Sequence, residues 1–273
     1  MRDDRKSRTR AEERLVPDGV ALSLQEAAAW DLFDVNVRVG PSGVHGELAL
    51  EPAELLQEMD DFYIRSALVS HWAAEEYDAA IGDEALARIA EPRFTPAWGI
   101  LPEASFIDAL AVCKPLAVRI TPGLRQHSFS LGRWCAGPMF EYLQDRSIVS
   151  LISRTDITWD EVAALLENFP RLPLVLLDTG YRADRYLFPL LDRFPSLHFD
   201  TATYLAHRQL ESVVEQRGSG QLLFGSRLPL FTPASAIGVL ASARIAEPDK
   251  RAIAGDNLRR LLAQAKARTG VQA

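Results

Sequence analysis

Residues 174–180 read Leu-Val-Leu-Leu-Asp-Thr-Gly, and this stretch decides the fold. Four consecutive apolar residues followed by a polar residue and a glycine predict a short buried strand at 174–177 that ends in a turn. A capping box at Thr158-Trp-Asp-Glu161 predicts a helix before this strand, and residues 185–194 predict another helix after it. A buried strand between two helices is typical of a parallel sheet.

The same alternation of strand and helix continues in both directions along the chain. Short apolar runs predict strands at 35–39, 64–70, 94–99, 116–120, 148–153, 174–177, 197–200 and 221–225. Helical patterns lie between them and after them, at 52–62, 77–90, 106–113, 138–144, 158–168, 185–194, 205–216, from 233 and at 249–265. Eight such units predict a single (β/α)8 TIM barrel, an α/β fold of about 250 residues, over residues 15–273.

Three further segments carry motifs that go beyond this alternation. Residues 34–40 read Asp-Val-Asn-Val-Arg-Val-Gly, residues 223–229 read Leu-Phe-Gly-Ser-Arg-Leu-Pro, and residues 256–262 read Asp-Asn-Leu-Arg-Arg-Leu-Leu. Together with residues 174–180 they resemble the amidohydrolase superfamily, specifically the "amidohydrolase 2" branch of metal-dependent TIM-barrel hydrolases and decarboxylases. The resemblance covers roughly residues 32–263 and implies the same barrel.

Four positions within these motifs depart from the family pattern. The family reads Asp-x-His-x-His-x-Gly in the first segment, ends the middle segment in His, and reads Gly-Ser-Asp-x-Pro in the last. This chain has Asn36, Arg38, Asp178 and Arg227 at those positions. The resemblance implies zinc or another divalent metal there, but a neutral amide is a poor zinc ligand and a guanidinium offers no lone pair. We therefore expect no metal site and no cofactor in this chain.

The replaced positions bring charges of both signs to one end of the barrel. Residues 36 and 38 share a face of one strand, and barrel active sites lie at the carboxyl ends of the strands. Because buried charges need partners, we expect Asp178 to pair with Arg227, Arg38 or both. Either this ion-pair cluster plugs the family's metal site, or the excess of arginine forms an anion pocket, with the ligand-binding residues Asn36, Arg38, Arg119, Arg154 and Arg227.

Three residues at the same end are candidates for acid–base catalysis. His71 follows the second strand, and imidazole titrates near neutrality. Asp178 and Asp200 close the sixth and seventh strands. Each candidate also has a structural interpretation, as a hydrogen-bonded histidine or as a partner of the arginines, and both interpretations stay open.

Composition narrows the choice of partner and compartment. The formal net charge is −7 and the isoelectric point is near 5.3, which argues against nucleic-acid binding. No apolar run is long enough to span a bilayer, and the charged residues 1–14 predict a disordered tail instead of an export signal. Cys113 and Cys135 fit neither a disulfide framework nor a zinc site, so we expect a cytoplasmic protein. A homo-oligomer is compatible with the sequence.

These observations leave three hypotheses for function. The first is an amidohydrolase-like, non-hydrolytic pseudoenzyme that binds a small anionic molecule or a protein partner at the barrel mouth. The second is a metal-independent enzyme that uses His71 or an aspartate as acid or base and holds a carboxylate substrate with the arginines. The third is a hydrolase or decarboxylase with relocated metal ligands. One fold hosts many functions, so the barrel alone does not choose among them.

Overall fold

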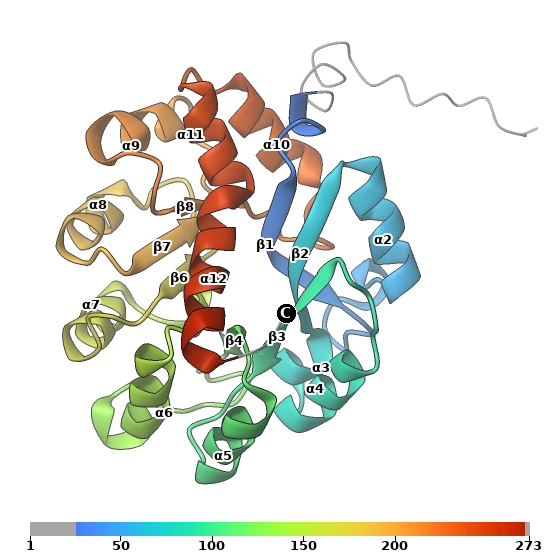
Figure 1. Ribbon diagram of the computed structural model, residues 1–273, viewed down its shortest axis with the longest axis vertical. Coiled ribbons are helices and arrows are strands. Elements are labelled where there is room, and N and C mark those ends of the chain that lie inside the picture. The colour runs from blue at the N-terminus through green and yellow to red at the C-terminus, as the bar shows by residue number, and fades with distance from the viewer. Residues whose placement is uncertain (1–25, 271–273) are drawn as a thin grey trace, which may run out of the picture.

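The protein is a barrel of eight parallel strands that follow one another in chain order, in a computed structural model that describes residues 26–270 (Figure 1). Each strand pairs with the next, and two backbone hydrogen bonds link the ends of the sheet: Val35 N donates to Phe224 O, and Arg38 N donates to Leu228 O, both at 3.0 Å. The predicted single (β/α)8 TIM barrel is therefore confirmed. The predicted tail at 1–14 lies outside the described residues.

Short, almost entirely buried strands form the barrel wall. Apolar residues on both faces of these strands exclude water, as expected for strands covered by helices outside and by core residues inside. The strands are β1 (Leu32–Val39), β2 (Ile64–His71), β3 (Phe94–Gly99), β4 (Ala117–Ile120), β5 (Val149–Ser153), β6 (Leu174–Leu177), β7 (Leu197–Asp200) and β8 (Leu222–Leu223).

Helices surround this wall (Figure 1), and their buried apolar side chains pack in the same core cluster as those of the strands. The α-helices of the described chain are α2 (Pro52–Asp61), α3 (Trp72–Glu76), α4 (Ala79–Ala87), α5 (Ala104–Cys113), α6 (Arg133–Asp145), α7 (Trp159–Asn168), α8 (Asp184–Arg193), α9 (Gln209–Arg217), α10 (Pro233–Ser242), α11 (Glu247–Arg251) and α12 (Asn257–Thr269). Shorter helical turns are η1 (Gly46–Leu48), η2 (Arg154–Asp156) and the π-helical η3 (Ala252–Asp256).

Some predicted boundaries are wrong for identifiable reasons. The helix expected at 77–90 is the shorter α4, which starts where the Asp78 side chain accepts a hydrogen bond from Ile81 N at 3.0 Å, and the five-residue α3 before it was not predicted. Helix α6 begins five residues before Pro138, where the prediction placed its start, and keeps that proline inside. Strand β8 is shorter than the predicted 221–225.

The last helix closes one end of the barrel. Figure 1 shows α12 lying across the strands, and its Leu258, Leu261 and Leu262 pack into the same core cluster as Phe33 and Val35 at the start of β1. Leucines spaced three and four residues apart lie on one helix face, which explains this contact. The end at which the strands begin is thus filled, and the end at which they finish is left for a site. In residues 26–270 no helix has the length and apolar character of a membrane span.

Candidate functional site at the barrel mouth

The four positions that depart from the family pattern meet at the carboxyl ends of the strands. Asn36 and Arg38 lie on β1, Asp178 directly follows β6, and Arg227 follows β8. Asn36 Nδ2 donates to Asp178 Oδ1 at 3.2 Å, and Asn36 Oδ1 accepts from Arg38 Nη1 at 2.8 Å. The convergence expected from strand order is therefore present.

Asn36 organises this cluster, and its amide has only one consistent orientation. A guanidinium can only donate, so the amide oxygen must face Arg38. The amide nitrogen then faces two carboxylates, Asp178 at 3.2 Å and Asp200 Oδ2 at 2.8 Å. Because Asp200 is completely buried beside the negative Asp178, its pKa is raised to about 8. Asp200 therefore lies beneath the mouth and holds Asp178 in place, with its Oδ1 accepting from Asp178 N at 3.0 Å.

Asp178 pairs with Arg227 but not with Arg38. Its Oδ1 lies 3.3 Å from Arg227 Nε, and its Oδ2 accepts from Ser153 Oγ at 2.7 Å. Both Asp178 and Arg227 have left-handed backbones, with φ of 57° and 63°. Such conformations cost about 1–3 kcal/mol in residues other than glycine and gather at functional sites. Asp178 was expected to pair with Arg227, Arg38 or both, and the structure has the pair with Arg227.

Arg38 has a different partner, Glu75, which the sequence reasoning missed. Arg38 Nε donates to both Glu75 carboxylate oxygens at 3.1 Å, and Arg119 Nη2 lies 3.3 Å from Glu75 Oε2. Burial opposes the charge of Glu75, but Arg119 and Arg38 outweigh it and hold its pKa at about 2. Burial, followed by repulsion from Arg38, lowers the pKa of Arg119. Two buried guanidinium groups thus share one carboxylate, which leaves one buried positive charge in excess.

A cavity of about 220 Å³ opens beside this triad. Arg38, Glu75 and Arg119 line it, together with Arg227 and Trp72. Three of the buried N–H groups that lack a hydrogen-bond partner within residues 26–270 belong to its wall: Trp72 Nε1, Arg119 Nε and Arg227 Nε. Arg227 Nε is near enough to Asp178 for an ion pair, but its N–H is not directed at the carboxylate. Unpaired buried donors are costly, so these three residues have hydrogen-bonding capacity beside the cavity that no described residue uses.

The other predicted site residues lie outside this cavity. His71 Nδ1 accepts from Ala73 N at 3.1 Å and starts α3, and burial lowers the pKa of this histidine. Arg154 Nη1 donates to Ile157 O, and its guanidinium lies 4.9 Å from the centre of the Trp159 ring. Arg154 therefore lines a separate, more open hollow of about 470 Å³ with Asp178, and does not join Arg119 as predicted.

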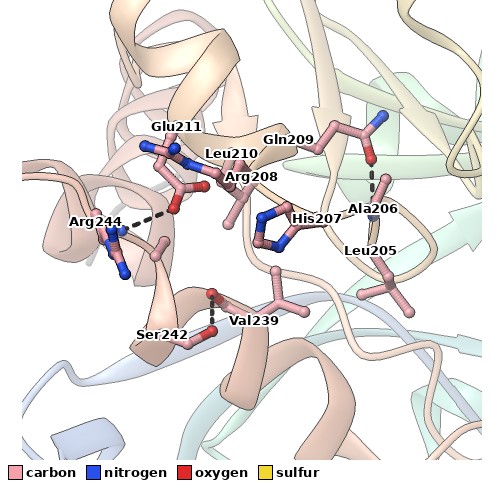
Figure 2. A pocket seen from close by; sticks show the side chains of 11 residues that line it. Leu205, Ala206, His207, Arg208, Gln209, Leu210, Glu211, Val239, Ser242 and Arg244 are labelled. Carbon is pink, nitrogen blue, oxygen red and sulfur yellow. Dashed lines mark hydrogen bonds between the residues drawn. The ribbon is translucent and has the colours of Figure 1, made fainter.

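A third hollow, of about 320 Å³, lies between the start of α9 and the end of α10, and Figure 2 shows it. Arg244 N donates to Glu211 Oε1 at 3.1 Å there, and His207, Arg208 and Arg244 are exposed. None of the buried polar atoms without a partner in the described chain belongs to this hollow. It therefore carries no sign of a ligand, in contrast to the cavity beside Arg119.

The side chains at the four family positions do not fit a divalent ion. Arg38 and Arg227 bring fixed positive charges, and the Asn36 oxygen already accepts from Arg38. Across residues 26–270 there is no group of three or more His, Cys, Asp and Glu side chains placed to hold a metal. No chemical step at these positions is therefore assigned to a metal.

Comparison with known proteins finds solved barrel structures that are similar in fold to this chain. No protein-family model matches the sequence, and no curated protein sequence matches it. A dihydroxybenzoic acid decarboxylase from Polaromonas sp. JS666 has a TM-score of 0.70 at 13% identity, over 87% of this chain and 98% of that one. A 5-carboxyvanillate decarboxylase from Novosphingobium aromaticivorans has a TM-score of 0.66 at 10% identity, over 86% of this chain and 97% of that one. A candidate amidohydrolase from Staphylococcus aureus has a TM-score of 0.69 at 13% identity, over 85% and 99%.

These solved structures correct one prediction and support another. The expectation of no metal cofactor is contradicted, because both decarboxylase structures contain manganese. That expectation rested on the four family positions only. The resemblance to the amidohydrolase superfamily that the sequence motifs indicated is confirmed, as a likeness of fold.

Proposed function

We propose that this protein is an amidohydrolase-like barrel that binds a small carboxylate in the mouth cavity and does not hydrolyse it. One observation carries the proposal: Arg119 lines the cavity, is buried, shares Glu75 with Arg38, and has an Nε without a hydrogen-bond partner among residues 26–270. A carboxylate would supply both the missing negative charge and the missing acceptor. Arginine suits this task because its planar fork matches the two oxygens of a carboxylate.

Two further hydrogen-bond donors beside Arg119, on Trp72 and Arg227, also suit a bound carboxylate. Trp72 Nε1 is buried and has no hydrogen-bond partner among residues 26–270, and the Arg38 guanidinium lies 5.1 Å from the centre of the Trp72 ring. Arg227 is partly exposed at the edge of the cavity. A carboxylate held by Arg119 therefore has an indole N–H and a second guanidinium on the same wall as further donors.

Binding of simple carboxylates tests this proposal. Thermal shift and calorimetry with acetate, propionate and benzoate are expected to show stabilisation of the wild-type protein. Arg119→Lys keeps the charge but loses the fork, and Trp72→Phe keeps the ring but loses the N–H, so each is expected to weaken binding about tenfold. Arg154→Lys is the matched control, because Arg154 lies outside this cavity. A flat response of the folded wild-type protein to all three acids would refute the proposal.

A second candidate function is a metal-dependent decarboxylase or hydrolase that acts on a carboxylate. The manganese in the two similar decarboxylases favours it. Metal analysis of the purified protein, followed by an assay of carbon dioxide release from 2,6-dihydroxybenzoate with added manganese, distinguishes the two. Stoichiometric metal together with turnover would replace the binding function by this second one. Carboxylate binding without turnover would favour the first.

A further inference from the structure

One carboxylate in the mouth cavity has no cation beside it. Asp156 follows β5 in the turn η2, is half-buried, and lines the same cavity as Arg119. Its one side-chain hydrogen bond in the described chain is a long one, from Gln126 Nε2 at 3.4 Å. No Lys, Arg or His nitrogen of residues 26–270 lies within 4.0 Å of it. Burial raises the pKa of Asp156, and Arg119 offsets this effect only in part.

The other two carboxylates of the cavity are satisfied. Glu75 is held by Arg38 and Arg119. Glu76 accepts from Ser42 Oγ at 2.7 Å and from Gly43 N at 2.9 Å. Asp156 is therefore the one acid of this wall whose charge is left without a strong partner among the described residues.

Arg119, which shares the Glu75 carboxylate with Arg38, and Asp156, which has no cation within 4.0 Å among residues 26–270, thus line one small cavity without pairing with each other. Arg119 lies on β4 and Asp156 follows β5, so the backbone of two adjacent strands sets their separation. Arg119 pairs with Glu75, and Asp156 accepts a long hydrogen bond from Gln126. A single ligand that carries both charges would satisfy the two groups at once.

We infer that the mouth cavity recognises a small zwitterion, with its carboxylate at Arg119 and its ammonium group at Asp156, as in a short aliphatic amino acid. This inference rests on the proposed function, since it names the class of carboxylate that the cavity selects. Asp156 is then the residue that determines specificity, and Arg119 is the general carboxylate anchor. A cavity of about 220 Å³ limits the ligand to a short carbon chain.

Matched ligand pairs test the inference directly. Affinities of the intact protein are measured by calorimetry for glycine against acetate, β-alanine against propionate, and γ-aminobutyrate against butyrate, at one pH and ionic strength. In at least one pair the amino acid is expected to bind about tenfold or more tightly, as a charge-assisted hydrogen bond contributes. Asp156→Asn keeps the side-chain shape and is expected to abolish this preference while it retains carboxylate binding. Glu84→Gln is the control, because Glu84 lies on the surface outside this cavity, and it is expected to retain the preference.

The possible outcomes distinguish failure of the zwitterion inference from failure of the proposed carboxylate-binding function. If acids without an amine bind as tightly as the amino acids in all three pairs, the zwitterion inference is wrong and the carboxylate site stands. A preference that survives in folded Asp156→Asn would also overturn the assignment of Asp156. If neither series binds, the proposed function fails and the inference fails with it.

Discussion

Glu75 and Arg119 form an ion pair at 3.3 Å in which the two side chains are 8% and 3% exposed. Glu75 also accepts Arg38 Nε and, at 2.6 Å, the Ser70 hydroxyl. One carboxylate on the short helix α3 therefore fixes two arginines from different strands, β1 and β4. The cationic wall of the mouth cavity depends on this single anion.

Glu75→Gln is expected to destabilise the protein by about 3–5 kcal/mol, because it leaves two buried guanidinium groups without a counter-charge. Urea unfolding at neutral pH measures the decrease in the free energy of unfolding. Glu84→Gln is the control, since Glu84 pairs with Arg88 on the surface of α4 and an exposed pair contributes about 1 kcal/mol or less. Equal losses in the two variants would show that the buried triad does not stabilise this barrel.

The sequence predicts the barrel well because its signal is local and repeated. Buried runs such as 174–177 and capping boxes such as that at Thr158 set strands and helices independently of distant contacts. Strand order then brings Asn36, Asp178 and Arg227 to one end without knowledge of any side-chain position.

The parts of the site that escaped prediction depend on contacts between distant segments. Glu75 lies in α3, a five-residue helix that was not predicted, and only the fold brings it to Arg38 and Arg119. The one indication in the sequence that Glu75 belongs to the site was its position four residues past the end of β2, because the active sites of such barrels are built from the loops that follow the strands. Arg154 was misplaced because its contact with Trp159 turns it away from the cavity.

The pH dependence of stability is expected to reveal the buried carboxyl of Asp200. Burial, and then the charge of Asp178, raise its pKa from 3.8 to about 8 in the folded protein. Between these values the folded state keeps a proton that the unfolded state has released, so stability falls as the pH rises from about 4 to about 8. For one proton the slope is about 1.4 kcal/mol per pH unit. Asp200→Asn is expected to reduce the slope of unfolding free energy against pH across this whole range.

Asp34→Asn provides the comparison for this experiment. Burial raises the pKa of Asp34 to about 6, so its effect on the slope ends near that pH. Between pH 6 and pH 8 the Asp34→Asn profile is therefore expected to follow the wild-type profile, whereas the Asp200→Asn profile is flatter. Parallel wild-type and Asp200→Asn profiles above pH 6 would mean that Asp200 is ionised throughout, held by the donors of Asn36 and Asp178.

Gly40→Ala is expected to displace the His71 side chain and, through it, to disturb the start of α3 beside the mouth cavity. Gly40 follows β1 with φ of +82°, and a Cβ atom there would lie 2.1 Å from His71 Nε2. The imidazole would have to move, and the hydrogen bond from Ala73 N that starts α3 would be lost with it. Gly180→Ala is the matched control, because its φ is +79° and a Cβ atom would meet nothing within 4 Å. In both variants the left-handed backbone of the new alanine is expected to lower the free energy of unfolding by about 1–2 kcal/mol. Gly40→Ala is expected to lower it by about 1–2 kcal/mol more, because the start of α3 is lost. It is also expected to weaken carboxylate binding, since α3 carries Glu75. Equal unfolding free energies for the two variants, with unchanged binding in both, would show that His71 does not support the site.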